Sequence, residues 1–243
     1  LGIDQNEARE RFDESLQVLQ QLLATGTCNF DGEFFQLQDV RLRPQPEKDL
    51  SANLWCAGGT EQTVQIIAKH NVRPLTIPTT SLESSLANIR RYAQLREEAG
   101  FEAAPTKLAV WTYVSEDGDE AAEIARKYMS QYSDSALRHY ELLGDHLKNI
   151  KGYESYAAQS EALQKDSSVF TDQFSQSHPW GTPEQAIEKT RELAEAFGTD
   201  EMMFVFRYGD MPMEMAERSM RLFADQVMPA LKDIQTQPIT ANG

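Results

Sequence analysis

The chain opens with apolar residues at the spacing of an amphipathic helix. Steps of four, three and four positions separate Phe12, Leu16, Leu19 and Leu23. Asp4 precedes this pattern as a candidate cap and Gly26 follows it, which predicts a helix over residues 4–24. Residues 28–46 then place a turn signal between aromatic residues and end at two prolines, which predicts a hairpin or an irregular excursion.

From residue 53 onward, short apolar runs alternate with helical patterns. The predicted strands are residues 53–57, 72–77, 108–114 and 202–206. The predicted helices are residues 60–69, 82–98, 117–143, 182–198 and 212–234. This alternation predicts an α/β fold with a parallel sheet and helices outside it. Four strand–helix units are half of an eight-stranded (β/α) barrel, and a complete open sheet of four strands fits the pattern about equally well.

Composition and charge exclude several classes of protein. The 23 Lys and Arg residues against 38 Asp and Glu residues give a net charge of -15, which argues against nucleic acid as a partner. No apolar stretch approaches the roughly 18 residues that a membrane span needs. Two cysteines are too few for a disulfide framework, and the chain shows no signal-peptide pattern, so we expect a cytoplasmic protein.

The organisation of the chain suggests that it is part of a longer protein. It starts at Leu1 and enters a strong helix almost at once. We expect residues 1–234 to form the C-terminal part of one barrel domain. Residues 144–178 are polar with weak periodicity and are predicted to be an insertion or lid, and residues 235–243 a disordered tail.

The best local signal for chemistry is the predicted turn between residues 57 and 63. A strand, two glycines and a threonine lead into a helix, and glycines let a backbone approach a ligand while the free N–H groups of a helix start attract an anion. Thr60 and Thr63 each offer a hydroxyl, which suits a phosphate. A plain capped helix is the alternative, and Glu61 counts against an anion unless it points to solvent.

A second set of candidates follows predicted strands or precedes predicted helices. In a barrel, such positions at the carboxyl ends of strands face the active site. The candidate substrate-binding residues are His178, Trp180, Arg207 and Tyr208. Packing of His178 on Trp180 is the alternative for the first pair. The four histidines and two cysteines show no metal-ligand spacing, so no metal site is predicted.

Several ordered segments resemble one enzyme family. They are residues 9–14, the excursion ending at residues 43–46, the turn at residues 57–60, and residues 178–185 (HPWGTPEQ), 207–212 (RYGDMP) and 218–231 (RSMRLFADQVMPAL). In this order and spacing they resemble the C-terminal region of the bacterial luciferase-like flavin monooxygenases, with limonene- and alkane-type enzymes nearest in character.

The resemblance implies a TIM barrel of the luciferase-like type, of which this chain holds only strands 5–8 and the preceding helix. It implies a monooxygenase that uses reduced FMN, delivered by a separate flavin reductase, and O₂ to oxygenate a small organic substrate, and it implies a homodimer. By position, the implied cofactor-binding residues are Ala57, Gly58, Gly59, Thr60 and Thr63. The family's catalytic histidine belongs to strands that would precede Leu1, so no catalytic residue is named.

Two other functions remain open at this point. A deazaflavin-dependent oxidoreductase of the same superfamily would share the fold. A non-catalytic flavin-binding or scaffold protein would account for the absent half of the barrel.

Overall fold

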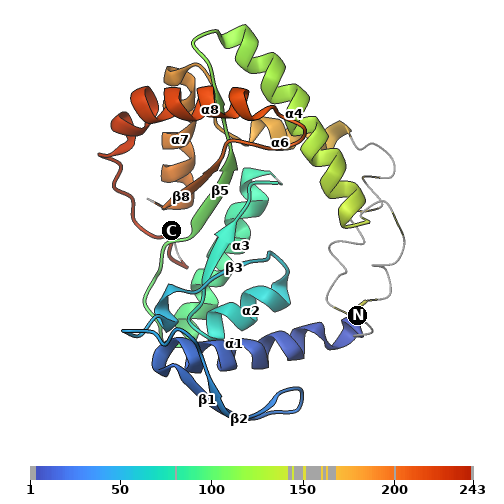
Figure 1. Ribbon diagram of the computed structural model, residues 1–243, viewed down its shortest axis with the longest axis vertical. Coiled ribbons are helices and arrows are strands. Elements are labelled where there is room, and N and C mark those ends of the chain that lie inside the picture. The colour runs from blue at the N-terminus through green and yellow to red at the C-terminus, as the bar shows by residue number, and fades with distance from the viewer. Residues whose placement is uncertain are drawn as a thin grey trace.

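The protein is built around a four-stranded parallel sheet (Figure 1). The computed structural model describes residues 4–79, 81–141, 168–199 and 201–241, together with residues 144, 150, 151, 160 and 163. In spatial order the strands are β3 (Trp55–Ala57), β4 (Arg73–Thr76), β5 (Lys107–Trp111) and β8 (Met202–Val205). All three neighbouring pairs are parallel, which confirms the four predicted strands and the parallel sheet.

The helices follow the predicted order, with α6 as one addition that the sequence did not predict. They are α1 (Ala8–Thr25), α2 (Glu61–Lys69), α3 (Leu82–Glu98), α4 (Gly118–His139), α6 (Ser168–Gln176), α7 (Pro183–Phe197) and α8 (Met213–Leu222). The helix predicted over residues 4–24 is confirmed as a short 3₁₀ turn, Gln5–Glu7, followed by α1. Gly26 ends α1 in the left-handed conformation, with φ of 76°, which a glycine adopts at little cost.

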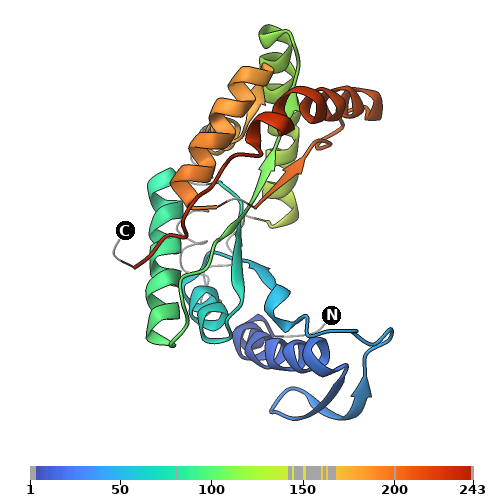
Figure 2. The same ribbon diagram turned by 90° about the vertical axis from the view of Figure 1, so that its left-hand side faces the viewer.

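The sheet winds in one direction only. Spatial order follows chain order, so every crossover steps the same way, and α3 and α7 lie on the same side of the sheet (Figure 2). Leu108 and Val110 pack beneath those helices, whereas Trp111 and Val205 belong to a cluster on the opposite face. An open doubly wound sheet reverses its strand order at a switch point, so this arrangement is the one a barrel uses.

The third predicted strand, residues 108–114, is divided in two. β5 ends at Trp111, and Tyr113–Val114 forms β6, which pairs in parallel with β7 (Trp180–Gly181). Thr112 still donates its N–H to the carbonyl of Val205 at 2.9 Å, while Ser115 already donates to Gly181 at 3.1 Å. The chain therefore leaves β8 for a new partner, and a two-residue strand such as β7 is too short to show any periodicity in the sequence.

The prediction of one continuous helix over residues 212–234 is wrong. α8 ends at Leu222, a π-helical turn covers Phe223–Val227, and a 3₁₀ turn covers Met228–Leu231. Pro229 lies in the 3₁₀ turn, where it cannot continue an α-helix because proline lacks an N–H and its ring clashes with the carbonyl one turn earlier. Beyond this turn, Ile239 packs against the cluster between the sheet and α7.

The excursion over residues 28–46 is confirmed as a hairpin. β1 (Thr27–Asp31) and β2 (Gln36–Arg41) are antiparallel. The carboxylate of Glu14 in α1 accepts hydrogen bonds from the N–H groups of Glu33, Phe34 and Phe35 at 2.7, 2.9 and 3.0 Å. This carboxylate fixes the hairpin turn to α1 on the side away from the sheet (Figure 1).

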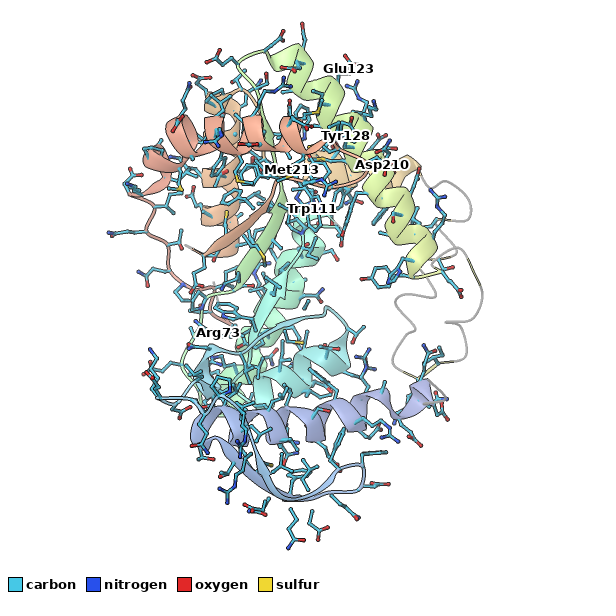
Figure 3. All side chains as sticks on the ribbon, viewed as in Figure 1. Arg73, Trp111, Glu123, Tyr128, Asp210 and Met213 are labelled. Atoms are coloured by element: carbon cyan, nitrogen blue, oxygen red, sulfur yellow. The ribbon has the colours of Figure 1, made fainter. Side chains whose placement is uncertain are left out.

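The amino ends of the strands hold a group of charged residues. Arg73 lies over the ring of Trp55 at 3.8 Å, and Lys107 pairs with Glu201 at 2.9 Å. Figure 3 shows Arg73 at the opposite end of the sheet from Trp111. In barrels the amino ends of strands contribute to stability and the carboxyl ends to chemistry, so the search for a site turns to the latter.

The helix after β7, α7, begins with a capping box. Thr182 accepts from the N–H of Gln185, and Gln185 accepts from the N–H of Thr182 at 2.9 Å. We expect Thr182→Ala to lower the free energy of unfolding by about 1 kcal/mol, measured by urea denaturation. Thr182→Ser keeps the hydroxyl and should stay near wild type, so equal losses in both variants would contradict a role for the cap.

Candidate functional site

The turn from β3 to α2 combines exposed residues with little or no side chain and buried threonines. Ala57, Gly58 and Gly59 are exposed, whereas Thr60 and Thr63 are 5% and 4% exposed. Thr60 caps α2 by accepting from the N–H of Thr63 at 3.3 Å, and the two hydroxyls lie 2.9 Å apart. The five predicted cofactor-binding residues therefore lie together between the end of β3 and the first turn of α2, and the threonine hydroxyls are already bonded inside the protein.

A cation from a distant helix joins this loop. Arg9 of α1 donates from its guanidinium to the hydroxyl of Thr63 at 2.8 Å. The same guanidinium acts against the effect of burial, which raises the pKa of the Cys56 thiol in β3. Arg9 belongs to a segment that carried the family resemblance, but its contact with Thr63 spans 54 residues and no local signal predicts it.

The carboxylate that weakened the case for an anion is paired with a cation. Glu61 is exposed and lies 3.0 Å from Arg91 of α3, and it also accepts from Gln65 at 2.9 Å. The N–H groups of Glu61 and Gln62 sit in the first turn of α2, where no intrahelical carbonyl can reach them. Backbone amides, a helix start and a guanidinium together suit a phosphate.

The second set of predicted residues gathers at the carboxyl ends of β5 and β8. His178 and Tyr208 are 2% and 4% exposed, and Trp180 packs against the cluster that contains Trp111 and Tyr208. Figure 3 shows Trp111 near Tyr128 of α4 at this end of the sheet. Arg207 differs from the others because it is exposed and donates to the carbonyl of Met211 at 3.2 Å.

His178 contacts different rings from the one its position suggested. Its ring lies 5.2 Å from Trp111 and 4.2 Å from Phe174, centroid to centroid. Trp180 instead donates its indole N–H to the carbonyl of Ser175 at 2.8 Å. Nothing in the strand position of Trp111 distinguishes it from an ordinary core residue, so only the fold reveals that it lies beside His178.

This end of the sheet holds several buried polar atoms that lack a protein partner. Among the described residues, no hydrogen bond reaches the side-chain polar atoms of Trp111, Thr112, Ser133 and Tyr208, or Nε2 of His178. Native proteins satisfy most buried polar groups, so each of these calls for a ligand or another partner.

Burial sets the protonation of this region. The pKa of His178 is lowered from 6.5 to about 3, first by burial and then by the charge of Lys189. The pKa of Tyr208 is raised, first by burial and then by its proximity to Tyr113. Both side chains are therefore neutral at physiological pH, and the histidine acts as a donor or acceptor without charge.

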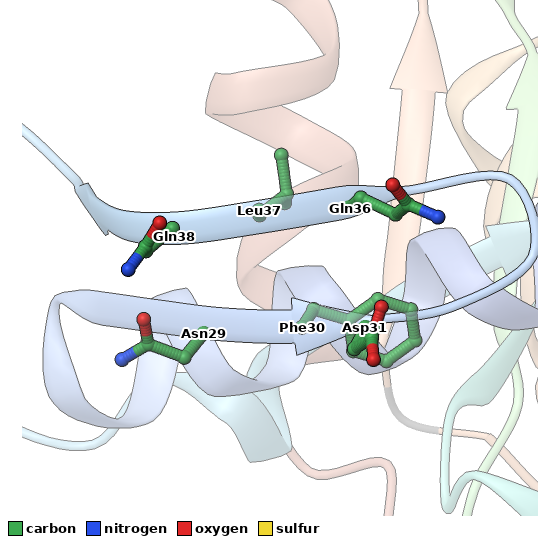
Figure 4. Close-up of a pocket in the computed structure, with 6 residues that line it drawn as sticks. All are labelled: Asn29, Phe30, Asp31, Gln36, Leu37 and Gln38. Atoms are coloured by element: carbon green, nitrogen blue, oxygen red, sulfur yellow. The ribbon is translucent and has the colours of Figure 1, made fainter.

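A shallow hollow of about 470 Å³ lies on the β1–β2 hairpin, lined by Phe30, Leu37 and four polar residues (Figure 4). It sits across α1 from the sheet, away from the strand ends (Figure 1). Within the described ranges, no group of His, Cys, Asp and Glu is arranged to hold a metal ion. Every described helix is too short or too polar to cross a bilayer.

The chain belongs to the luciferase-like monooxygenase family, whose sequence profile matches residues 1–200. It is 24% identical over 240 residues to the alkanal monooxygenase alpha chain of Photobacterium leiognathi, an alignment that covers 96% of this chain and 67% of the relative. This membership confirms the resemblance found in the sequence.

Solved structures share the fold. The oxygenating constituent of 3,6-diketocamphane monooxygenase from Pseudomonas putida, in complex with FMN, matches with a TM-score of 0.58 and 16% identity, covering 94% of this chain and 64% of that one. Long-chain alkane monooxygenase LadA matches with a TM-score of 0.63 and 17% identity, covering 95% and 57%. The chain thus spans less than two thirds of either solved structure.

Proposed function

We propose that this chain is part of a flavin-dependent monooxygenase that uses reduced FMN and O₂ to oxygenate a small organic substrate. The observation that carries the proposal is the exposed β3–α2 turn, in a member of the luciferase-like monooxygenase family, with a helix start and a guanidinium beside it. The bound reduced flavin would supply the electrons that the reduction of O₂ requires.

The residues of the turn fit the phosphate of FMN. An added Cβ on Gly59 would meet only Asn88, at 3.6 Å, so the backbone is open to a ligand on that side. The loop from Ala57 to Gly59 and the first amides of α2 would contact the phosphate. Thr60 and Thr63 would hold the loop and orient Arg9 toward it, because their hydroxyls bond one another and the hydroxyl of Thr63 accepts from Arg9.

The substrate would lie at the carboxyl ends of β5 and β8. His178, Trp180 and Tyr208 belong to or border a buried aromatic cluster there, and Arg207 lies at its exposed margin. A dry, aromatic surface keeps water from the reacting groups, which is a requirement for an oxygenase. Residues 144–178 would serve as the lid, and most of that segment lies outside the described residues.

The assembly is proposed in the same way. We take the four strands as strands 5–8 of an eight-stranded barrel, because β3 and β8 are edge strands of a singly wound sheet. A separate flavin reductase would deliver the reduced flavin, a second copy of the chain would form a homodimer, and the protein would work in the cytoplasm. No residue described above is proposed as the catalytic base or acid.

Flavin binding tests the proposal directly. We expect FMN, titrated against the protein and followed by flavin fluorescence, to bind at micromolar concentration, and riboflavin, which lacks the phosphate, to bind at least about tenfold more weakly. With reduced FMN, O₂ and an organic substrate, the product should gain one oxygen atom. Binding of a deazaflavin in preference to FMN would move the protein to the alternative oxidoreductase, and no flavin binding would end both ideas.

Arg9 offers a sharper test of the phosphate site. Arg9→Gln should weaken FMN binding by about tenfold, since one charge-assisted hydrogen bond is lost, and should leave riboflavin binding unchanged. Arg11→Gln is the matched control, because Arg11 lies on the same helix and pairs with Glu7 at 2.8 Å. A similar loss of FMN affinity in both variants, or a loss of riboflavin affinity in Arg9→Gln, would show that Arg9 does not act on the phosphate.

A further inference from the structure

His178 is held in one tautomer by the backbone beside it. The N–H of Trp111 points to Nδ1 of the imidazole at 3.5 Å, at the long limit of a hydrogen bond. Because Nδ1 accepts, the ring proton lies on Nε2 in the neutral imidazole. Nε2 is therefore an N–H donor.

Two buried N–H donors thus belong to neighbouring aromatic rings, and neither has an acceptor among the described residues. Nε2 of His178 and Nε1 of Trp111 are both buried and bond to no atom of the described residues. The two rings lie 5.2 Å apart at an angle of 47°. Trp180, a few residues away, shows the usual outcome, because its indole N–H has found a carbonyl at 2.8 Å.

The surroundings of the two donors are aromatic. Tyr132 of α4 lies 4.7 Å from Trp111, and Phe174 of α6 lies 5.3 Å from Trp111 and 4.2 Å from His178, between ring centroids. Such walls accept a flat or apolar body. Donors without a facing carboxylate favour a ligand oxygen over an ammonium group, and no metal-binding cluster is found among the described residues.

We propose that His178 and Trp111 present their two N–H groups to the carbonyl oxygen of a flat, apolar ligand. This deepens the proposed function by naming the class of ligand at the ends of β5 and β8, and its role in oxygenation rests on that function. His178 is then a binding residue whose neutral form matters, because a carbonyl oxygen accepts the hydrogen bond that no atom of the described part of the chain accepts. The buried ring of Phe174 packs against both rings, so we expect this packing to open as the ligand enters.

Either of two ligands could supply this carbonyl oxygen, because an organic substrate and the flavin ring can both carry carbonyl groups on an apolar body. The test therefore uses two probes separately. 2-Acetonaphthone, with 2-ethylnaphthalene as its carbonyl-free counterpart, represents a substrate. FMN represents the cofactor.

The first experiment reads the donors directly in the wild-type protein. In ¹⁵N–¹H spectra the indole N–H signal of Trp111 should move downfield when 2-acetonaphthone or FMN is added, and should not do so with 2-ethylnaphthalene. The signal of Trp180 is the internal control, since its N–H is already bonded to Ser175. No downfield shift of the Trp111 signal with either carbonyl probe would overturn the proposal. A shift with one probe alone identifies the source.

The second experiment changes the histidine. His178→Phe keeps a ring and removes the donor, so affinity for the probe that shifted Trp111 should fall by about tenfold while 2-ethylnaphthalene is unaffected. His178→Gln returns an N–H near the position of Nε2 and should recover much of that loss. Equal losses for the ketone and for 2-ethylnaphthalene would assign His178 to packing and overturn the proposal. Because these readouts need no oxygenation, they stand even where the FMN test of the proposed function fails.

Discussion

Lowering the pH from 7 to 5 is expected to reduce the free energy of unfolding by about 2 kcal/mol through His178 alone. Burial lowers the pKa of this histidine from 6.5 in the unfolded chain to about 3 in the folded protein. Between these two values the unfolded chain binds a proton that the folded protein does not. Stability that is fully present above pH 6.5 is therefore lost as the pH falls, by roughly 4–5 kcal/mol in all by pH 3.

The measurement compares urea denaturation at pH 7 and pH 5 in the wild type and in His178→Phe, which has nothing to titrate at this position. The variant should lose about 2 kcal/mol less than the wild type over this interval, whatever its stability at pH 7. His139→Gln is the control, because His139 is exposed. Parallel slopes for wild type and His178→Phe would show that the folded protein takes up the proton at ordinary pH, and the donor assignment at Nε2 would fall with it.

The elements that the sequence predicted well are those with a local cause. Gly26 ends α1 because its backbone takes a left-handed conformation, and Thr182 with Gln185 begins α7 through reciprocal hydrogen bonds. Such signals lie within four residues of one another and need no tertiary contact. The strands were found for a similar reason, since short β-branched and aromatic runs between glycines or prolines carry their own pattern.

The parts that were missed depend on contacts between distant segments. β7 exists because Tyr113 leaves β8 and finds Trp180, a pairing that spans 67 residues. α6 lies within the segment predicted to be an insertion or lid. Its hydrophobic pattern is weak in the sequence alone, because the aromatic rings that bury Phe174 come from β5 and α4. Hydrophobic periodicity records which face is buried, but it does not record what buries it.

The candidate site also combines residues with a local sequence signal and residues brought together only by long-range contacts. The β3–α2 turn was recognised because glycines and threonines follow one another in the chain, and its residues do lie together. Arg9, which adds the positive charge, comes from 54 residues away. The pairing of His178 with Trp111 also crosses 67 residues, and neither residue type at its position distinguishes a ligand donor from core packing. The sequence therefore predicted where the loops lie, but only the fold shows that Arg9 contacts Thr63 and that Trp111 contacts His178.

Gly181→Ala is expected to lower the free energy of unfolding by about 3 kcal/mol, which corresponds to roughly 6–12 °C in the midpoint of thermal unfolding. Gly181 has φ of 131°, a conformation that L side chains rarely adopt. An added Cβ would also lie 2.9 Å from Cβ of Gln185 and would meet its amide oxygen. That oxygen accepts the N–H of Thr182 in the capping box of α7, so moving it away removes this half of the capping box.

Gly100→Ala separates the two causes. Gly100 has φ of 83° and no atom within 4 Å of an added Cβ, so its substitution should cost only the conformational strain, about 1 kcal/mol. The excess at Gly181 then measures the clash and the lost hydrogen bond, together with the extra strain of a φ of 131°. In a Gly181→Ala background, Gln185→Ala should have almost no further effect on the cap, because the bond from the N–H of Thr182 to the amide oxygen of Gln185 is already broken. Additive losses would mean that the cap survives the methyl group and that backbone conformation alone requires glycine at the entry to α7.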